Sequence, residues 1–457
     1  MRELRTEVPG HLDLTVIRLA REIRAEVAES LATRGVTARD DERVDETGVM
    51  QLARRLVARA LDQRLAGILA AGGGAPAPLH EQAVAELAMA MLFGLGVLQL
   101  FVDDPEVENI DANGAERAYV TYADGMKRLV GPVAESDDEL VATIRAAGAR
   151  FGLAERRFDN AQPELDLRLP DGSRLSAVMS VTEHPVVDIR RHRLTDHSLA
   201  DLVALGMLDD ELASFLGAAV RSKHNILVSG AMNAGKTTLL RALAAEIPPD
   251  ERIVTIEQAL ELGLDHQTKR HPDCVAMEAR LANIEGVGAI PVAQLVRRSL
   301  RMNASRVIVG EVLGDEVIPM LNAMSQGRSG SMATIHADSS AGVFRRLASY
   351  AVQAPERLPL EASNLLIAGS IHFVVHVDVV DAPNHDGSRC PSARRLRQVT
   401  SIREVVDAEG SMIVSNEIYK PAADGRARRS APLRDSTASA LARNGFDVRR
   451  LAPARSR

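Results

Sequence analysis

The chain has few cysteines and aromatic residues and no excess of positive charge. Its two cysteines among 457 residues, Cys274 and Cys390, lie far apart and form no C-x-x-C pair, so neither a zinc site nor a disulfide framework is indicated. Tryptophan is absent and aromatic residues make up 3%, so the chain lacks an aromatic platform for stacking nucleic-acid bases. The formal net charge of −7 also argues against a nucleic-acid-binding protein.

Long apolar runs are absent as well. The most apolar stretch, residues 87–98, is too short to span a bilayer, which needs about 18 or more residues. No signal peptide is visible, so we expect a cytoplasmic protein. The length favours two or three domains, and a hydrophobic content of 46% allows sizeable cores built from Leu, Val, Ile and Ala.

The strongest local signal lies in residues 225–244. This stretch opens with an apolar run at 226–228 that is typical of a buried parallel strand, and it closes with a segment of helical spacing at 238–243. Between them stands Gly230-Ala231-Met232-Asn233-Ala234-Gly235-Lys236-Thr237, the complete phosphate-loop pattern G-x-x-x-x-G-K-[ST]. Because a strand before and a helix after are the context that confirms this motif, we predict that the chain binds a nucleoside triphosphate.

Each part of this loop has a physical role. Gly230 and Gly235 permit backbone angles that let successive N–H groups turn towards an anion. Lys236 adds a cation, the Thr237 hydroxyl is a ligand for Mg²⁺, and the following helix directs its positive end to the same place. We therefore predict ATP and Mg²⁺ as cofactors, bound by Gly230, Ala231, Asn233, Ala234, Gly235, Lys236, Thr237 and Thr238.

Three predicted strands after the loop each end in a polar residue: 252–256 in Glu257, 306–310 in Glu311 and 331–335 in His336. The carboxyl ends of strands in an open α/β sheet border the ligand crevice. We predict that Glu257 or Glu261, four residues further on, orients or deprotonates the attacking water. Glu311 is predicted to face Mg²⁺ or its water, as a Walker B acid does, and His336 to belong to the same site.

The predicted fold class is α/β, with an N-terminal α+β domain followed by a RecA-like P-loop NTPase domain whose sheet is mostly parallel. We expect a helical extension with a Gly/Pro linker at 1–78 and an α+β domain with hairpins at 79–195. The ATPase domain is expected at 196–380, followed by a β-hairpin with a basic, flexible tail at 381–457. The apolar stripe of residues 12–27 is either a docking element or a face packed on the protein itself.

Several segments resemble the secretion ATPases of type II and type IV systems, closest to the CpaF/TadA-like branch that drives tight-adherence pilus assembly. Residues 257–262 resemble that family's aspartate box, 277–280 its L-E-T-R segment and 283–286 its N-x-E-G segment. Residues 300–312 resemble its Walker B region and 330–337 its histidine box. Upstream, 104–107, 113–114 and 169–174 resemble its N-terminal domain.

The resemblance implies a homo-hexameric ring with nucleotide between N- and C-terminal domains. ATP turnover would move these domains and act on an inner-membrane platform protein, with the chain peripheral at the inner face of the cytoplasmic membrane. His336 would sense the γ-phosphate. A cation that stabilises the charge on the transferred phosphoryl group would be supplied across a domain or subunit boundary. The candidate residues are Arg280, Arg168, Arg174 and Arg190.

The chain departs from the family pattern at four places. Gln258 replaces an Asp, Leu313 an Arg and Arg328 a His, and residues 303–305 replace Arg-Pro-Asp. The predicted function is an ATP-hydrolysing motor for pilus assembly or protein secretion. The alternative is a nucleotide-dependent switch or scaffold with little turnover, which the changes at 258 and 313 make conceivable. A helicase-like motor has only scattered arginines in its favour, and no nucleic-acid partner is expected.

Overall fold

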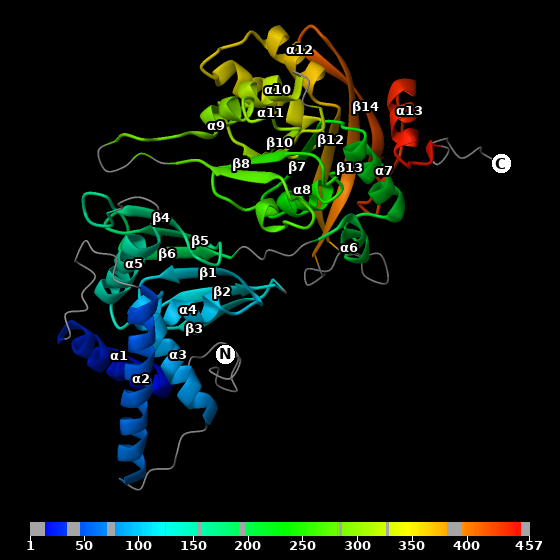
Figure 1. Cartoon of the computed structure of the whole chain (residues 1–457). Helices are drawn as coiled ribbons and strands as arrows, with labels where there is room; N and C mark the ends of the chain where they lie inside the picture. Colours follow the sequence, from blue (N-terminus) through cyan, green and yellow to red (C-terminus); the bar gives the residue numbers. More distant parts are fainter. Residues whose placement is uncertain are drawn as a thin grey trace. The chain divides into compact units, whose positions relative to one another are not determined.

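The computed structural model describes residues 14–33, 46–70, 78–123, 125–152, 157–191, 197–280, 282, 286–325, 329–381 and 395–448. The chain divides into two compact units, Met1–Arg193 and Leu194–Ala282 with Gly286–Arg457, and each has its own hydrophobic core (Figure 1). The structure does not describe residues 72–77, which belong to the predicted Gly/Pro linker, residues 283–285 of the N-x-E-G segment, Arg328, Cys390 or residues 382–394.

The first unit begins with three long helices, α1 (Leu14–Thr33), α2 (Glu46–Ala70) and α3 (Pro78–Phe93), which pack against one another. The apolar stripe of α1 is buried at Val16, Ala20, Ile23 and Val27. These side chains belong to the same core as the sheet of this unit. Of the two interpretations of the stripe, packing on the protein itself is therefore the one the structure bears out.

The sheet of the first unit is antiparallel throughout, with six strands in the order β3-β2-β1-β6-β5-β4. The predicted hairpins are present, and β3 was not predicted. The strands are β1 (Val107–Asn113), β2 (Ala118–Tyr122), β3 (Lys127–Gly131), β4 (Glu164–Arg168), β5 (Arg174–Val178) and β6 (Val186–Arg190). The helical elements are η2 (Gly96–Leu98), α4 (Gln99–Val102) and α5 (Asp137–Phe151).

The second unit is built on a nine-stranded sheet in the order β15-β14-β13-β12-β7-β11-β10-β8-β9. Pairing is parallel from β12 to β9 and antiparallel from β12 to β15, which agrees with the predicted mostly parallel sheet. The strands are β7 (Ile226–Gly230), β8 (Ile253–Glu257), β9 (Cys274–Glu278), β10 (Arg306–Val312), β11 (Met332–His336), β12 (Phe373–Asp381), β13 (Arg395–Glu409), β14 (Met412–Pro421) and β15 (Ala427–Arg429).

Helices cover both faces of this sheet (Figure 1). Along β7, Ile226 and Val228 join the core formed with α7, α8 and α13, whereas Leu227 joins the core formed with α9 to α12. Strands covered on both faces are apolar at nearly every position, which explains the apolar run before the phosphate loop. The helices are α6 (Leu199–Ala204), α7 (Asp210–Arg221), α8 (Lys236–Ala244), η3 (Leu264–His266), α9 (Val292–Ser299), α10 (Val317–Ser325), α11 (Gly342–Gln353), α12 (Leu360–Ser370) and α13 (Asp435–Arg443).

The end of the chain corrects one prediction. The hairpin of β13 and β14 is present, but the residues predicted as a basic tail include β15, which pairs with β14, and α13, which packs on α7. Arg429 Nε donates to Glu211 Oε1 at 2.6 Å. The tail was mispredicted because Glu211, the partner of Arg429, lies 218 residues away in sequence, where no local pattern indicates it.

A buried ion pair anchors the start of β10. Arg306 is fully buried, and its guanidinium donates to both carboxylate oxygens of Glu251 at 2.9 and 2.8 Å and to the Val220 carbonyl at 2.8 Å. A buried charge is tolerated only when it is paired and hydrogen-bonded, so this clamp fixes where β10 enters the sheet.

No helix within the described ranges is both long and apolar enough to cross a membrane.

Candidate nucleotide site

The phosphate loop joins the last residue of β7 to the first turn of α8, as the sequence predicts. Gly230 approaches β12 so closely that a Cβ there would lie 2.2 Å from the Val377 carbonyl oxygen. Gly235 caps α8 with φ of 97°, a left-handed conformation that favours glycine. The two glycines are therefore required by the sheet on one side and by the helix start on the other.

The loop lysine is held inside the protein. Lys236 is 7% exposed, and its Nζ donates to the Ala231 carbonyl at 2.9 Å, across the loop itself. It also lies 3.1 Å from Nδ1 of His336, at the end of β11. The register of β11 on β7 places His336 opposite Gly230, which brings the histidine to the mouth of the phosphate loop.

A bulge in β10 presents Glu311, the predicted Walker B acid, to the same histidine. The register between β10 and β11 shifts between Val309 and Val312, and the Thr334 hydroxyl donates to the Gly310 carbonyl at 2.6 Å. Bulges commonly re-aim a side chain beside a functional site. The Glu311 carboxylate lies 2.6 Å from His336 Nε2, so Lys236, His336 and Glu311 form one connected chain.

The donors in this chain fix the protonation of His336. A lysine ammonium only donates, so Nδ1 of His336 must accept, and the ring proton must sit on Nε2, from which it is donated to Glu311. Burial lowers the pKa of His336, and the nearby Lys236 lowers it further, although the Glu311 carboxylate acts in the opposite direction. The ring is therefore neutral near pH 7.

Glu257 is the last residue of β8 and Glu261 lies in the loop that follows, and the structure gives them different surroundings. Glu257 is 3% exposed, and its Oε2 accepts the backbone N–H groups of Glu261 at 2.7 Å and Leu262 at 2.9 Å. Glu257 therefore orders the loop that carries Glu261, which is partly exposed. A Cβ on Gly310 would lie 2.9 Å from Glu257 Cγ, so this buried acid packs beside the Walker B bulge.

The candidate arginines have their own local arrangements. Arg280 is exposed, and its Nε donates to the Gly288 carbonyl at 2.7 Å. In the first unit, Arg168 pairs with Arg174 across β4 and β5, and Arg174 with Arg190 across β5 and β6, so the three form one row across the sheet. The row brings together three residues that are not neighbours in the sequence.

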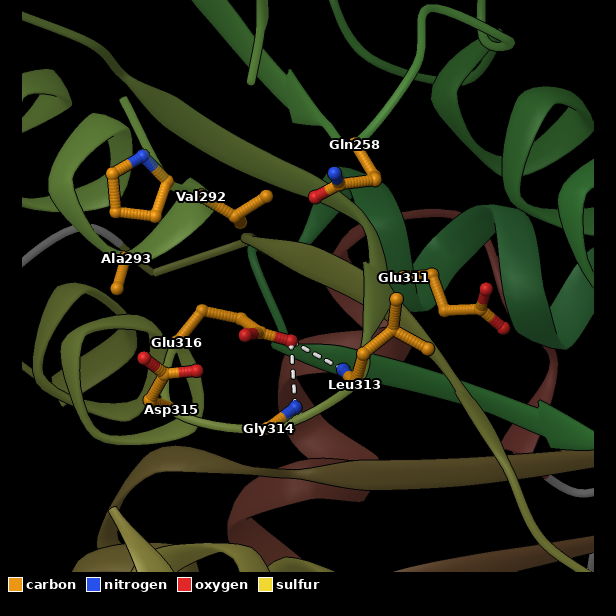
Figure 2. Close-up of a pocket in the computed structure, with 9 residues that line it drawn as sticks. Gln258, Val292, Ala293, Glu311, Leu313, Gly314, Asp315 and Glu316 are labelled. Carbon is orange, nitrogen blue, oxygen red and sulfur yellow. Dashed lines mark hydrogen bonds between the residues drawn. The ribbon is translucent and has the colours of Figure 1, made fainter. Parts of the chain in front are cut away.

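A pocket of about 190 Å³ opens beside Glu311. Two departures from the family pattern, Gln258 and Leu313, both line it (Figure 2). Glu316, 6% exposed, accepts the backbone N–H groups of Leu313 and Gly314 and holds the loop after β10, as the dashed lines in Figure 2 show. The two positions that depart from the expected pattern therefore line one pocket.

The residues present fit ATP with Mg²⁺. The glycines at 230 and 235 leave the loop without side chains at its two ends, and the cation of Lys236 lies across it. No group of three or more His, Cys, Asp or Glu side chains in the described part of the chain is placed to hold a metal. Mg²⁺ bound with a nucleotide needs few protein ligands, since phosphates and waters complete its shell, and Thr237 and Glu311 are the candidates.

The chain belongs to the family described as type II/IV secretion system protein, whose model matches residues 94–426. This is a family of secretion-system ATPases, so membership supports ATPase activity in general. A putative conjugal transfer protein of Mycobacterium tuberculosis is 33% identical over 328 residues, covering 70% of this chain and 86% of that protein. The type IV secretion system protein VirB11 of Brucella suis is 28% identical over 347 residues, covering 70% and 92%.

Among solved structures, the VirB11 ATPase of the Brucella suis type IV secretion system, in complex with sulphate, is 26% identical with a TM-score of 0.35 and covers 71% of this chain and 96% of that chain. The Legionella pneumophila ATPase DotB is 19% identical with a TM-score of 0.48 and covers 69% and 81%.

Replacing Glu311 by Gln tests the Walker B role. Glu311→Gln keeps the side chain's shape and can still accept a hydrogen bond from His336, but removes the charge that faces metal and water. Hydrolysis should fall at least ~10²-fold while ATP still binds. Phosphate release and ATP binding by the purified chain measure the two effects separately, and parental turnover in the variant would assign the role to another acid.

Proposed function

We propose that this chain is an ATP-hydrolysing motor that powers pilus assembly or protein secretion through an inner-membrane platform protein, in the tight-adherence pilus branch of its family. It would act at the inner face of the cytoplasmic membrane. The observation that carries the proposal is the connected chain of Lys236, His336 and Glu311. It links the side chain that binds the terminal phosphates to the acid that supports metal and water.

This arrangement favours turnover over mere binding. A phosphate arriving at Lys236 would compete for the ammonium that now faces His336, so His336 would report γ-phosphate to Glu311. Water would then attack the γ-phosphorus while the bond to the bridging oxygen of ADP breaks, and its proton would pass to a carboxylate. Glu261 is the better candidate for that proton, because Glu257 already accepts two backbone N–H groups. Mg²⁺ would neutralise phosphate charge.

The second candidate is a nucleotide-dependent switch or scaffold of the same machine. Its support is the pocket beside Glu311, where Gln258 and Leu313 remove a carboxylate and a cation from the surroundings of the reacting groups. A switch binds ATP and holds it, whereas a motor releases phosphate in steady state.

Steady-state phosphate release, with and without a Lys236 substitution, separates these functions. Lys236→Ala removes a charge-assisted contact worth about 1.5–3 kcal/mol, so ATP should bind roughly ten- to a hundredfold more weakly and turnover should be lost. A parental chain that binds ATP but releases at most one phosphate per subunit would be a switch. Unchanged ATP affinity in Lys236→Ala would remove the phosphate loop from the proposal.

We further propose that the functional form is a ring, most simply a homo-hexamer. Lys236, Glu261 and Glu311 supply phosphate, water and metal contacts, but phosphoryl transfer also calls for a cation on the developing charge, commonly an arginine from a neighbouring molecule. The row of Arg168, Arg174 and Arg190 supports this proposal, because it concentrates charge on one stretch of the first unit.

Mixing two inactive chains tests delivery between subunits. An Arg190-substituted chain mixed with Lys236→Ala should regain part of the ATPase activity, because each defect is complemented by a neighbour. Specific activity of the parental chain should also rise with protein concentration as rings form. Repeating the mixture with Arg174-, Arg168- and Arg280-substituted chains identifies the arginine. Full, concentration-independent activity of a monomer on a sizing column would rule the ring out.

A further inference from the structure

An arginine from the C-terminal part of the chain lies against the phosphate loop. Arg397, on β13, is exposed, and its Nε donates to the Asn233 carbonyl at 3.0 Å. A Cβ on Gly235 would lie 3.3 Å from Arg397 Cδ, so the apolar stem of the arginine packs where the loop enters α8. Neither contact follows from the phosphate-loop motif, since Arg397 is 164 residues from Asn233 in sequence.

The sheet holds Arg397 in this position. Strand β12 pairs with β7 so that Val377 lies opposite Gly230, and β13 pairs with β12 so that Arg397 lies opposite Val379. The strand that carries Arg397 is thus tied to the strand that leads into the loop. A side chain fixed by a packed sheet can hold a loop in a defined conformation.

Through the peptide bond between Asn233 and Ala234, the contact with Arg397 also sets the direction of the Ala234 N–H. In a planar trans peptide, the C=O of one residue and the N–H of the next point in opposite directions. Arg397 holds the Asn233 carbonyl towards itself, so the Ala234 N–H is directed away from Arg397. That N–H now donates to the Ala231 carbonyl at a long 3.3 Å, the same oxygen that accepts from Lys236. A phosphate oxygen is a stronger acceptor than the Ala231 carbonyl and would replace it as the partner of the Ala234 N–H.

Asn233 also adopts a conformation that benefits from support. Its φ is 60°, in the left-handed region, where residues other than glycine are uncommon, although Asn is among those that tolerate it best. A charged donor on its carbonyl stabilises this backbone conformation before any nucleotide binds.

We propose that Arg397 is a positioning residue of the phosphate loop, which holds the Asn233–Ala234 peptide so that the Ala234 N–H is presented to the phosphates of a nucleoside di- or triphosphate. The inference rests on the proposed function, since it concerns the same nucleotide. Arg397 affects the affinity for nucleotide rather than the chemical step, because it contacts the loop backbone and no group assigned to water or metal.

The test compares Arg397→Ala and Arg397→Lys with Arg428→Ala in the full chain. Arg428, on β15, is an exposed arginine of the same sheet that pairs with Asp424 at 3.2 Å, so it controls for loss of a surface cation. The measurements are the Kd of fluorescently labelled ADP, the KM and kcat for ATP, and the melting temperature without nucleotide. Lys236→Ala is measured alongside.

Arg397→Ala should raise the Kd for ADP and the KM for ATP roughly tenfold, the scale for losing one charge-assisted hydrogen bond, with kcat within about twofold of parental. Arg397→Lys keeps the stem and the charge, so its Kd and KM should lie between those of Arg397→Ala and the parent. Arg428→Ala should match the parent in both. The melting temperature without nucleotide should stay close to parental, because residues 231–233 are exposed and the loop can relax locally when the contact is lost.

Parental Kd and KM in Arg397→Ala, beside a weakened Lys236→Ala, would overturn this inference and leave the proposed function standing. A lowered melting temperature with parental affinity would show Arg397 to be a structural residue of β13 and would likewise overturn it. If Lys236→Ala itself bound ADP as the parent does, the proposed function would fail instead.

Discussion

The contact between the Lys236 ammonium and Nδ1 of His336 is the interaction on which the site depends. It exists only if β7 and β11 end at the same level of the sheet, which their register achieves by placing His336 opposite Gly230. It also fixes the neutral tautomer of the histidine, which in turn directs the remaining ring N–H to Glu311. The start of α8 and the ends of β10 and β11 are thereby joined through two hydrogen bonds before any nucleotide is bound.

The surroundings of these strand ends keep them in place. The buried pair of Arg306 and Glu251 sets the start of β10, and the bulge at Gly310 then turns Glu311 towards β11. On the other side of β7, the Val377 carbonyl leaves room for nothing larger than glycine at position 230. The site is thus shaped by strands on both sides of the phosphate loop, including one that no motif marks.

The parts of the protein that local patterns encode could be predicted from the sequence. The phosphate loop, the strands that carry Glu257, Glu311 and His336, and the antiparallel hairpins of the first unit all follow from short periodic segments and turn residues, although β10 runs one residue past Glu311. The sequence also indicated a mostly parallel sheet, because apolar strands alternate with helical segments.

Contacts between distant residues could not be predicted in this way. The bulge in β10, the Arg306–Glu251 pair, the buried setting of Glu257 and the approach of Arg397 to Asn233 each depend on partners that only the folded sheet brings together. For the same reason β15 and α13 were taken for a tail. That Gln258 and Leu313 line the same pocket likewise could not be read from either segment alone.

The state of the His336 ring tests the central claim most directly. Nitrogen-15 NMR of histidine-labelled protein, with the His336 signals among those of 12 histidines assigned by a His336→Gln variant, reports which ring nitrogen carries the proton. We predict the neutral tautomer protonated on Nε2 near pH 7, a pKa below the ordinary value, and a rise of that pKa in Lys236→Ala. A ring protonated on Nδ1, or an imidazolium near pH 7, would contradict the account.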